Sequence, residues 1–157
     1  MTPDPWLEPA DYSGPAPVVA AAIVDSLQAP ARLLCAARAY PTELAGRFEL
    51  PGGKIDAGES PIEALEREIR EELGTALVLG PEVDGPGGRW WPVLQGRTMG
   101  VRLAEIAPGA PAPRAGDSHA ELRWVPLPEV AELDWIGNDL LIVLAVANLC
   151  ARLRRED

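Results

Sequence analysis

The sequence is poor in positive charge and in cysteine. It has 14 lysines and arginines against 24 aspartates and glutamates, which gives a formal net charge of −10 and a sequence pI near 4.6. Nonspecific binding to DNA, RNA or an anionic membrane needs basic patches, so the composition argues against such functions. The two cysteines, Cys35 in a strand-like run and Cys150 in a helix-like run, do not resemble a disulfide framework or a metal knuckle. We expect both to be buried thiols in a reducing, cytoplasmic compartment.

Long apolar runs and a leader-like start are also missing. The most apolar segment, residues 140–151, is shorter than the roughly 20 residues of a membrane-spanning helix, so we expect a buried helix and no membrane partner. The first 17 residues contain three acids and five prolines without an apolar core, which does not fit a signal peptide. We therefore expect an irregular arm over residues 1–16 and a single domain over residues 17–157.

Short apolar runs alternate with turns and helical patterns. Residues 18–24 and 33–37 flank a Pro-containing turn and suit paired strands in a covered sheet. Glycine- and proline-rich breaks separate the further strand candidates, at residues 76–79, 90–94, 99–106 and 122–125. A short helix is expected over residues 127–133, and a longer one, capped by Asn138 or Asp139, runs to the C-terminal arginines. This alternation predicts a mixed α/β fold.

A central helix is predicted from Pro61 to Leu73. Ser60 and Glu63 form the Ser-x-x-Glu pattern of a capping box, and Gly74 is a natural C-terminal stop. Apolar side chains recur along this helix at spacings of three and four and form one stripe for the core: Ile62, Leu65, Ile69 and Leu73.

Three glutamates crowd one flank of this helix. Glu71 and Glu72 lie three and four residues after Glu68, and Arg67 is the one cation near enough to offset them. Each such pair of like charges destabilises an exposed helix by roughly 0.2–0.5 kcal/mol. The cluster is therefore either a solvated acidic face or a set of oxygen ligands for a hard cation such as Mg²⁺.

The spacing around the cluster separates these two interpretations. Gly53 is followed after five residues by Glu59 and, after seven more, by Arg-Glu-Ile-Arg-Glu-Glu-Leu-Gly at residues 67–74. This pattern resembles the Nudix box; Thr75 departs from it, because the family has an aliphatic residue there. The resemblance implies the Nudix fold, an α/β/α sandwich with a mixed β-sheet. It also implies hydrolysis of a phosphoanhydride bond in a nucleoside diphosphate linked to another group.

The resemblance further implies a cofactor and its ligands. The metal would be Mg²⁺, or Mn²⁺ in its place, and the ligands would be Gly53 through its carbonyl, Glu68, Glu71 and Glu72. Glu68 is expected to act as ligand and base, and Glu71 mainly as a ligand within the catalytic group. Arg67 is expected to orient the carboxylates.

Segments outside the box are similar to the MutT-like branch, of the CTP pyrophosphohydrolase or 8-oxo-dGTP diphosphatase type. This similarity covers residues 18–147 and implies conversion of a nucleoside triphosphate to the monophosphate and pyrophosphate, with a cytidine-type or modified nucleotide favoured. Asp139 would then accept a hydrogen bond from the cytosine amino group, although helix capping explains it equally well. The other substrate-binding candidates, which also have ordinary structural explanations, are Arg38, Lys54 and Asn138.

One acidic residue expected in relatives is displaced here. Relatives commonly have an acid directly before a histidine, whereas this chain reads Gly116-Asp117-Ser118-His119, with Ser118 in that place. Asp117 is the candidate replacement as a metal ligand. His119, the only histidine, is expected to be structural.

Two alternative functions stay open. The chain could hydrolyse ADP-ribose or another nucleoside diphosphate derivative, or it could bind nucleotides without hydrolysing them. The complete set of glutamates argues against the second alternative. In each case the partner is a small-molecule nucleotide, and both a monomer and a homodimer are compatible with the sequence.

Overall fold

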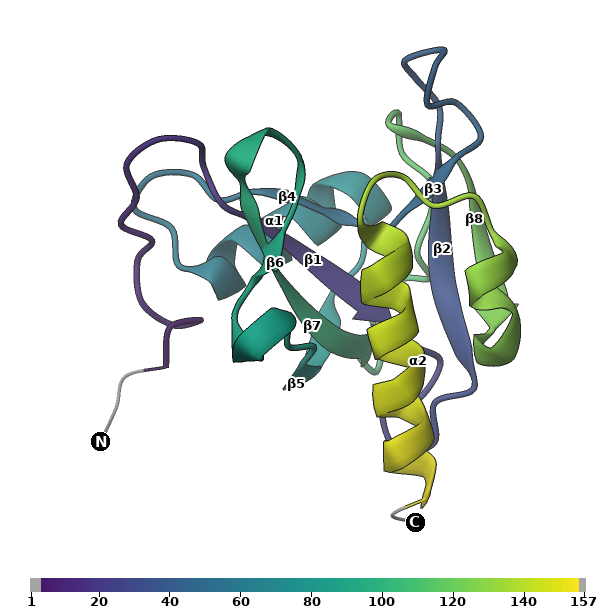
Figure 1. The fold of residues 1–157 in the computed structure, drawn as a ribbon. Coiled ribbons are helices and arrows are strands. Elements are labelled where there is room, and N and C mark those ends of the chain that lie inside the picture. Colours follow the sequence, from purple (N-terminus) through teal and green to yellow (C-terminus); the bar gives the residue numbers. More distant parts are fainter. Residues whose placement is uncertain (1–3, 156–157) are drawn as a thin grey trace.

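Two β-sheets lie between helices in the computed structural model, which describes residues 4–155 (Figure 1). The strands are β1 (Val18–Ile23), β2 (Arg32–Arg38), β3 (Phe48–Glu49), β4 (Gly52–Lys54), β5 (Leu77–Glu82), β6 (Trp91–Pro92), β7 (Thr98–Ile106) and β8 (His119–Pro126). The α-helices are α1 (Pro61–Leu73) and α2 (Asp139–Arg155). Three 3₁₀ turns, η1, η2 and η3, cover Pro86–Gly88, Leu94–Gly96 and Leu127–Glu132.

The larger sheet has the strand order β4-β1-β7-β5, with β6 paired to β7, and the smaller sheet has the order β3-β2-β8. The pairing of β1 with β7 is parallel and the other pairings are antiparallel. One hydrophobic cluster includes Leu65, Ile69 and Leu73 of α1, and the other includes Ile142, Val143 and Val146 of α2. The fold is therefore the α/β/α sandwich with a mixed sheet that the sequence predicted.

Strand β1 lies at the centre of the packing. Val19, Ala21 and Ile23 belong to the cluster that includes α1, whereas Ala20 and Ala22 belong to the cluster that includes α2. Both faces of the strand are thus covered, which explains why its sequence is apolar throughout rather than alternating.

The predicted pairing of residues 18–24 with residues 33–37 is wrong. Strand β1 is bonded to β4 on one edge and to β7 on the other, so it has no free edge for β2. It meets β2 only through an isolated bridge between Val24 and Leu33. Strand β2 instead forms the smaller sheet with β3 and β8.

The expected strand over residues 90–94 is reduced to the two residues of β6. Pro92 has no N–H to extend the ladder, and Gln95 and Gly96 have φ angles of 64° and 71°, which turn the chain back. Strands β3 and β4 were not predicted, because elements of two or three residues carry no periodic signal.

The observed helices agree closely with those predicted from the sequence. Helix α1 has the predicted bounds, with both hydrogen bonds of the Ser60–Glu63 capping box and with Gly74 in the left-handed conformation at φ 65°. Cys35 and Cys150 are buried free thiols, as expected. Among residues 4–155 no helix is long and apolar enough to cross a membrane.

Residues 4–17 contain no helix or strand, yet they pack on the rest of the chain. The Trp6 side chain is only 2% exposed, its ring lies 5.2 Å from that of Trp90, and its indole N–H donates to Glu82. The Trp6 carbonyl accepts a hydrogen bond from the amide of Ile62 in the first turn of α1 (3.1 Å). Residues 1–3 of the predicted arm lie outside the described residues.

Candidate active site

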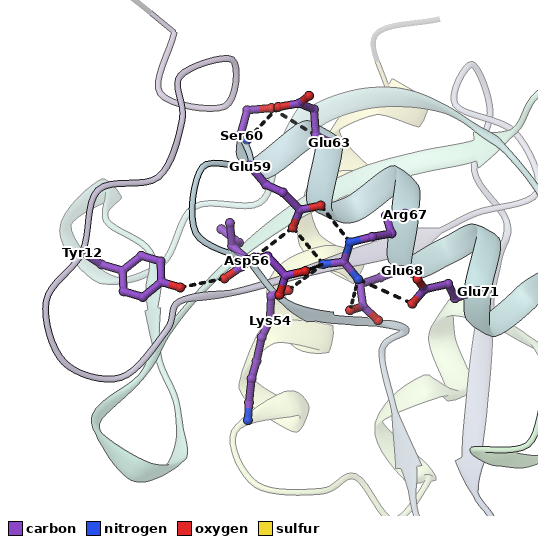
Figure 2. Close-up of polar contacts among 10 residues, drawn as sticks. Tyr12, Lys54, Asp56, Glu59, Ser60, Glu63, Arg67, Glu68 and Glu71 are labelled. Carbon is purple, nitrogen blue, oxygen red and sulfur yellow. Dashed lines mark hydrogen bonds and ion pairs between the residues drawn. The ribbon is translucent and has the colours of Figure 1, made fainter.

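Arg67 joins the loop before α1 to the glutamates on that helix (Figure 2). Its guanidinium donates two hydrogen bonds to Glu59, at 2.7 and 2.8 Å, and one to the carbonyl of Lys54. On the other side it lies 2.8 Å from Glu68 and 3.5 Å from Glu71. The hydrogen bond with Glu59 is the main cause that raises the pKa of Arg67 and lowers the pKa of Glu59. The guanidinium thus contacts carboxylates of the loop and of the helix at the same time.

Glu68 lies directly over the backbone of Gly53. A Cβ atom added to Gly53 would lie 2.3 Å from Cδ of Glu68, so no larger residue fits without moving that carboxylate. The fold thus brings together the predicted carbonyl ligand and the predicted base, which are separated by 14 residues along the chain.

Glu72 has a buried oxygen without a donor. Its Oε2 atom has no hydrogen-bond partner among the described residues. Burial raises the pKa of Glu72 to about 7; His119 and the backbone amide of Gly52 oppose this shift, whereas the carboxylates of Glu68 and Glu49 add to it. A buried carboxylate oxygen that lacks a donor and faces like charge is suited to a cation.

The donor set fits a hard divalent cation such as Mg²⁺, because all the candidate atoms are carboxylate or carbonyl oxygens. In their present rotamers, no three Asp, Glu, His or Cys side chains of residues 4–155 form a group that could hold a metal ion. Glu68 and Glu71 both point to Arg67 instead. The Glu71 side chain is 59% exposed, so it is free to change rotamer without disturbing the core.

An open cleft of about 360 Å³ adjoins this cluster. Its lining includes all four substrate-binding residues expected from the sequence, together with two of the expected metal ligands: Arg38, Lys54, Asn138, Asp139, Gly53 and Glu72. These residues come from β2, β4, α1 and the start of α2, so tertiary folding has gathered them from nearly the whole chain. The ammonium group of Lys54 points away from the Arg67 cluster (Figure 2).

The cleft also contains Glu49, which was not expected. Its Oε2 atom lies 3.3 Å from the guanidinium of Arg38 and 2.8 Å from Nε2 of His119. The His119 side chain is fully buried, and its Nδ1 atom has no partner within residues 4–155. Arg38 also donates to the carbonyl of Tyr40. The one sequence feature that could have marked Glu49 as a cleft residue is its position just before the Leu-Pro-Gly-Gly loop.

Arg97 is a second residue of the cleft that sequence reasoning missed. It follows the η2 turn, lines the cleft and donates a hydrogen bond of 2.8 Å to the carbonyl of Ala16 in the N-terminal segment. No local motif marks it, because its place in the cleft depends on how the β6–β7 connection folds over β1.

Asp139 is buried at the start of α2 and accepts a hydrogen bond of 3.0 Å from the amide of Leu50 through Oδ2. Burial raises the pKa of Asp139 to about 6; the hydrogen bond from Leu50 opposes this shift, and Glu49 adds to it. The side-chain amide of Asn138 donates to the carbonyl of Pro92, and its main-chain carbonyl accepts from the amide of Ile142 in the first turn of α2. The sequence offered Asn138 or Asp139 as the cap of this helix; the Asp139 carboxylate bonds instead to Leu50, outside the helix.

Asp117 lies in the turn just before β8 and is exposed. Within residues 4–155 no group of three side chains that could hold a metal ion includes Asp117. The preceding Gly116 packs against the backbone of Glu72, which places Asp117 near the end of α1.

Comparisons with known proteins agree with this arrangement. The family model described as NUDIX domain matches residues 15–143, which include every residue that lines the cleft. A Mycobacterium tuberculosis protein provisionally named 8-oxo-dGTP diphosphatase 2 is 39% identical over 125 residues, covering 78% of this chain and 81% of that protein. The CTP pyrophosphohydrolase of Escherichia coli is 40% identical over 65 residues, covering 41% of this chain and 46% of that protein. The solution structure of the E. coli ORF135 protein has a TM-score of 0.68 and 28% identity, covering 87% of this chain and 91% of that one.

Proposed function

The chain belongs to the NUDIX family, and from that membership we propose that it is a Mg²⁺-dependent nucleoside triphosphate pyrophosphohydrolase that favours cytidine nucleotides. As a Nudix hydrolase it is a pyrophosphohydrolase that acts on nucleotides. Beyond this family activity, we propose the metal, the substrate and the roles of individual residues.

The observation that carries the proposal is the partnerless buried oxygen of Glu72, beside Glu68 and Gly53 at the wall of the cleft. We assign the metal ligands to Gly53, Glu68, Glu71 and Glu72, with Asp117 as a further ligand from the loop before β8. Bound Mg²⁺ would neutralise phosphate charge and lower the pKa of a coordinated water. Glu68 is the proposed acceptor of the proton from that water, and Arg67 holds its carboxylate in place.

Three cations line the same cleft and are suited to the polyphosphate: Arg38, Lys54 and Arg97. Arg38 is fixed by Glu49 and by the carbonyl of Tyr40, and Arg97 by the carbonyl of Ala16. Because these bonds occupy only part of each guanidinium, further N–H groups are free to donate to phosphate oxygens.

Asp139 is the residue proposed to recognise the base of the nucleotide. Leu50 occupies Oδ2, and Oδ1 accepts no hydrogen bond from the described residues. An ionised carboxylate only accepts hydrogen bonds, so it favours the amino group at N4 of cytosine over the carbonyl oxygen at the same position of uracil. CTP, dCTP and their 5-methylated forms are therefore the expected best substrates.

A modified purine nucleotide is the second candidate. The M. tuberculosis relative is named for 8-oxo-dGTP, and the raised pKa of Asp139, about 6, makes its protonated form accessible. A protonated carboxyl can donate as well as accept, so it can also bind the carbonyl oxygen of an oxidised guanine.

A panel of CTP, dCTP, UTP, 8-oxo-dGTP and ADP-ribose, assayed with Mg²⁺, with Mn²⁺ and with EDTA, tests the proposal. We expect metal-dependent release of pyrophosphate, fastest from CTP or dCTP. A higher kcat/KM for 8-oxo-dGTP would favour the second candidate. Equal rates on CTP and UTP would refute the role of Asp139, and cleavage of ADP-ribose alone would refute the triphosphate assignment. Nucleotide binding without turnover would identify a non-catalytic module.

A further inference from the structure

The loop between β7 and β8, residues 107–118, is bonded to the C-terminal end of α1. The amide of Arg114 donates a hydrogen bond of 2.9 Å to the carbonyl of Leu73, and the hydroxyl of Thr75 donates to the carbonyl of Pro111. The last carbonyls of a helix have no partner inside the helix, so the bond from Arg114 satisfies a group that otherwise needs water. The loop therefore completes the helix end rather than merely passing it.

Gly116 brings this loop into direct contact with the last turn of α1. A Cβ atom added to Gly116 would lie 2.8 Å from the carbonyl oxygen of Glu72 and 3.8 Å from that of Glu71. Three residues later, His119 begins β8 and bonds to Glu49 in the cleft. The backbone that carries two glutamates of the candidate site and the backbone that leads to His119 thus touch at Gly116.

Thr75 stands where the Nudix box has an aliphatic residue, and its hydroxyl forms a hydrogen bond that an aliphatic side chain cannot form. The side chain is buried at 5% exposure, and the proline-rich loop provides the acceptor at Pro111. An aliphatic side chain would fill the same space but would leave that carbonyl without this donor. The second departure, at Asp117 and Ser118, lies at the far end of the same loop.

We propose that Thr75 and Gly116 are positioning residues, which fix the loop 107–118 on the end of α1. They hold the last turn of the helix, with Glu71 and Glu72, and the start of β8, with His119, as one unit. The kinetic consequence rests on the proposed hydrolase function: a loosened loop lowers kcat and weakens Mg²⁺ binding. Asp139 is held by the amide of Leu50 rather than by the loop, so KM for the nucleotide changes less than kcat.

The test compares Thr75→Val, which removes the hydroxyl but keeps the shape, with Thr75→Ser, which restores a hydroxyl. Thr42→Val, at an exposed position, is the matched control. In Thr75→Val we expect hydrogen exchange at the Arg114 amide to accelerate about fivefold, the factor that corresponds to one lost hydrogen bond. We expect kcat to fall about 10- to 100-fold, because small displacements of catalytic groups have effects of that size. Calorimetric titration with Mg²⁺ alone should show weaker binding, and Thr75→Ser should recover all three quantities.

Gly116→Ala provides an independent perturbation, because it pushes the loop away without removing any hydrogen-bonding group. It should reproduce the kcat and Mg²⁺ effects, and the double variant should fall short of the sum of the two single effects, since both act through one contact. Unchanged exchange at Arg114 in Thr75→Val would overturn the proposal, as would a loss expressed only in KM. If the parent protein hydrolyses no nucleotide, the proposed function fails, while exchange and Mg²⁺ titration still decide the positioning role.

Discussion

At Glu68 the proposed chemistry depends on one carboxylate held between Arg67 and Gly53. Glu68→Gln keeps the shape but removes the negative charge and the ability to accept a proton. We expect kcat to fall by roughly 10²–10⁴, the range for the loss of an acid–base or charge-stabilising group. Steady-state kinetics with Mg²⁺ measures the change. Glu66→Gln, an exposed glutamate on the same helix, is the control and should keep the parental rate. Full Mg²⁺-dependent turnover in Glu68→Gln would exclude it as the base.

Glu72 makes the metal-free protein sensitive to pH. Because its pKa is raised to about 7 from an ordinary value of 4.5, the folded state holds this proton more tightly than the unfolded state. The contribution of Glu72 to stability is therefore complete below about pH 4.5 and is lost as the pH rises through about 7. Glu72→Gln avoids that loss. In EDTA its Tm should exceed that of the parent by more at pH 8 than at pH 5.5, as measured by calorimetry. The same difference at both pH values would contradict this account.

Asp139 should determine which base is accepted. Replacing it by Ala should lower kcat/KM for CTP by a factor that corresponds to about 1–3 kcal/mol of lost transition-state stabilisation, because the cytosine amino group loses its acceptor. Asp139→Asn can donate as well as accept, so it should narrow the difference between CTP and UTP. The decisive measurement is the ranking of substrates, since the amide of Leu50 also loses its partner and stability falls in any case. A destabilised Asp139→Ala variant with an unchanged ranking would assign this residue to helix packing alone.

At the scale of elements, the N-terminal segment acts as a brace for the start of α1. Trp6 packs against Trp90 and accepts a hydrogen bond from Ile62 in the first helical turn. Further along the segment, the Tyr12 hydroxyl donates to the carbonyl of Ile55 in the loop before the helix (Figure 2). This segment contacts the Nudix box although it contains no helix or strand of its own.

Trp6→Ala should therefore lower the free energy of unfolding by about 3–5 kcal/mol, as expected for the loss of a buried aromatic side chain. Leu7→Ala is the control, because Leu7 is 63% exposed and its loss should change stability little. Urea denaturation measures both. Equal effects of the two substitutions would support the sequence-based prediction of a separate arm over residues 1–16 beside a domain over residues 17–157. A large difference would place Trp6 within the folding unit.

At the scale of the whole molecule, the formal net charge is −10, and the glutamates of the candidate metal site contribute to it. A cation that binds only the folded state raises its stability by mass action. The Tm should therefore rise with Mg²⁺ concentration and fall on addition of EDTA. Matched NaCl separates site binding from general screening, since ionic strength alone weakens the repulsion between exposed charges. Glu72→Gln should lose most of the Mg²⁺-specific rise. If NaCl of equal ionic strength reproduces the whole effect, the metal site is contradicted.

The sequence by itself determined the features that depend on neighbours along the chain. The bounds of α1, its capping box and the stop at Gly74 follow from contacts within four residues, so local spacing was sufficient. The same spacing put Glu68, Glu71 and Glu72 on one flank of a helix. The family followed from this fixed spacing as well.

Only the tertiary structure decided which distant groups meet. Glu49 contacts His119 across 70 residues, and Asp139 accepts from Leu50 across 89. Which strand occupies each edge of β1 depends on all the competing strands at once, so no local pattern favoured β4 and β7 over β2. Burial of Trp6 and the loop contact at Thr75 likewise depend on packing between segments far apart in the chain. Local hydrogen bonds and spacing thus determined helix α1, whereas long-range pairing and burial decided the walls of the adjoining cleft.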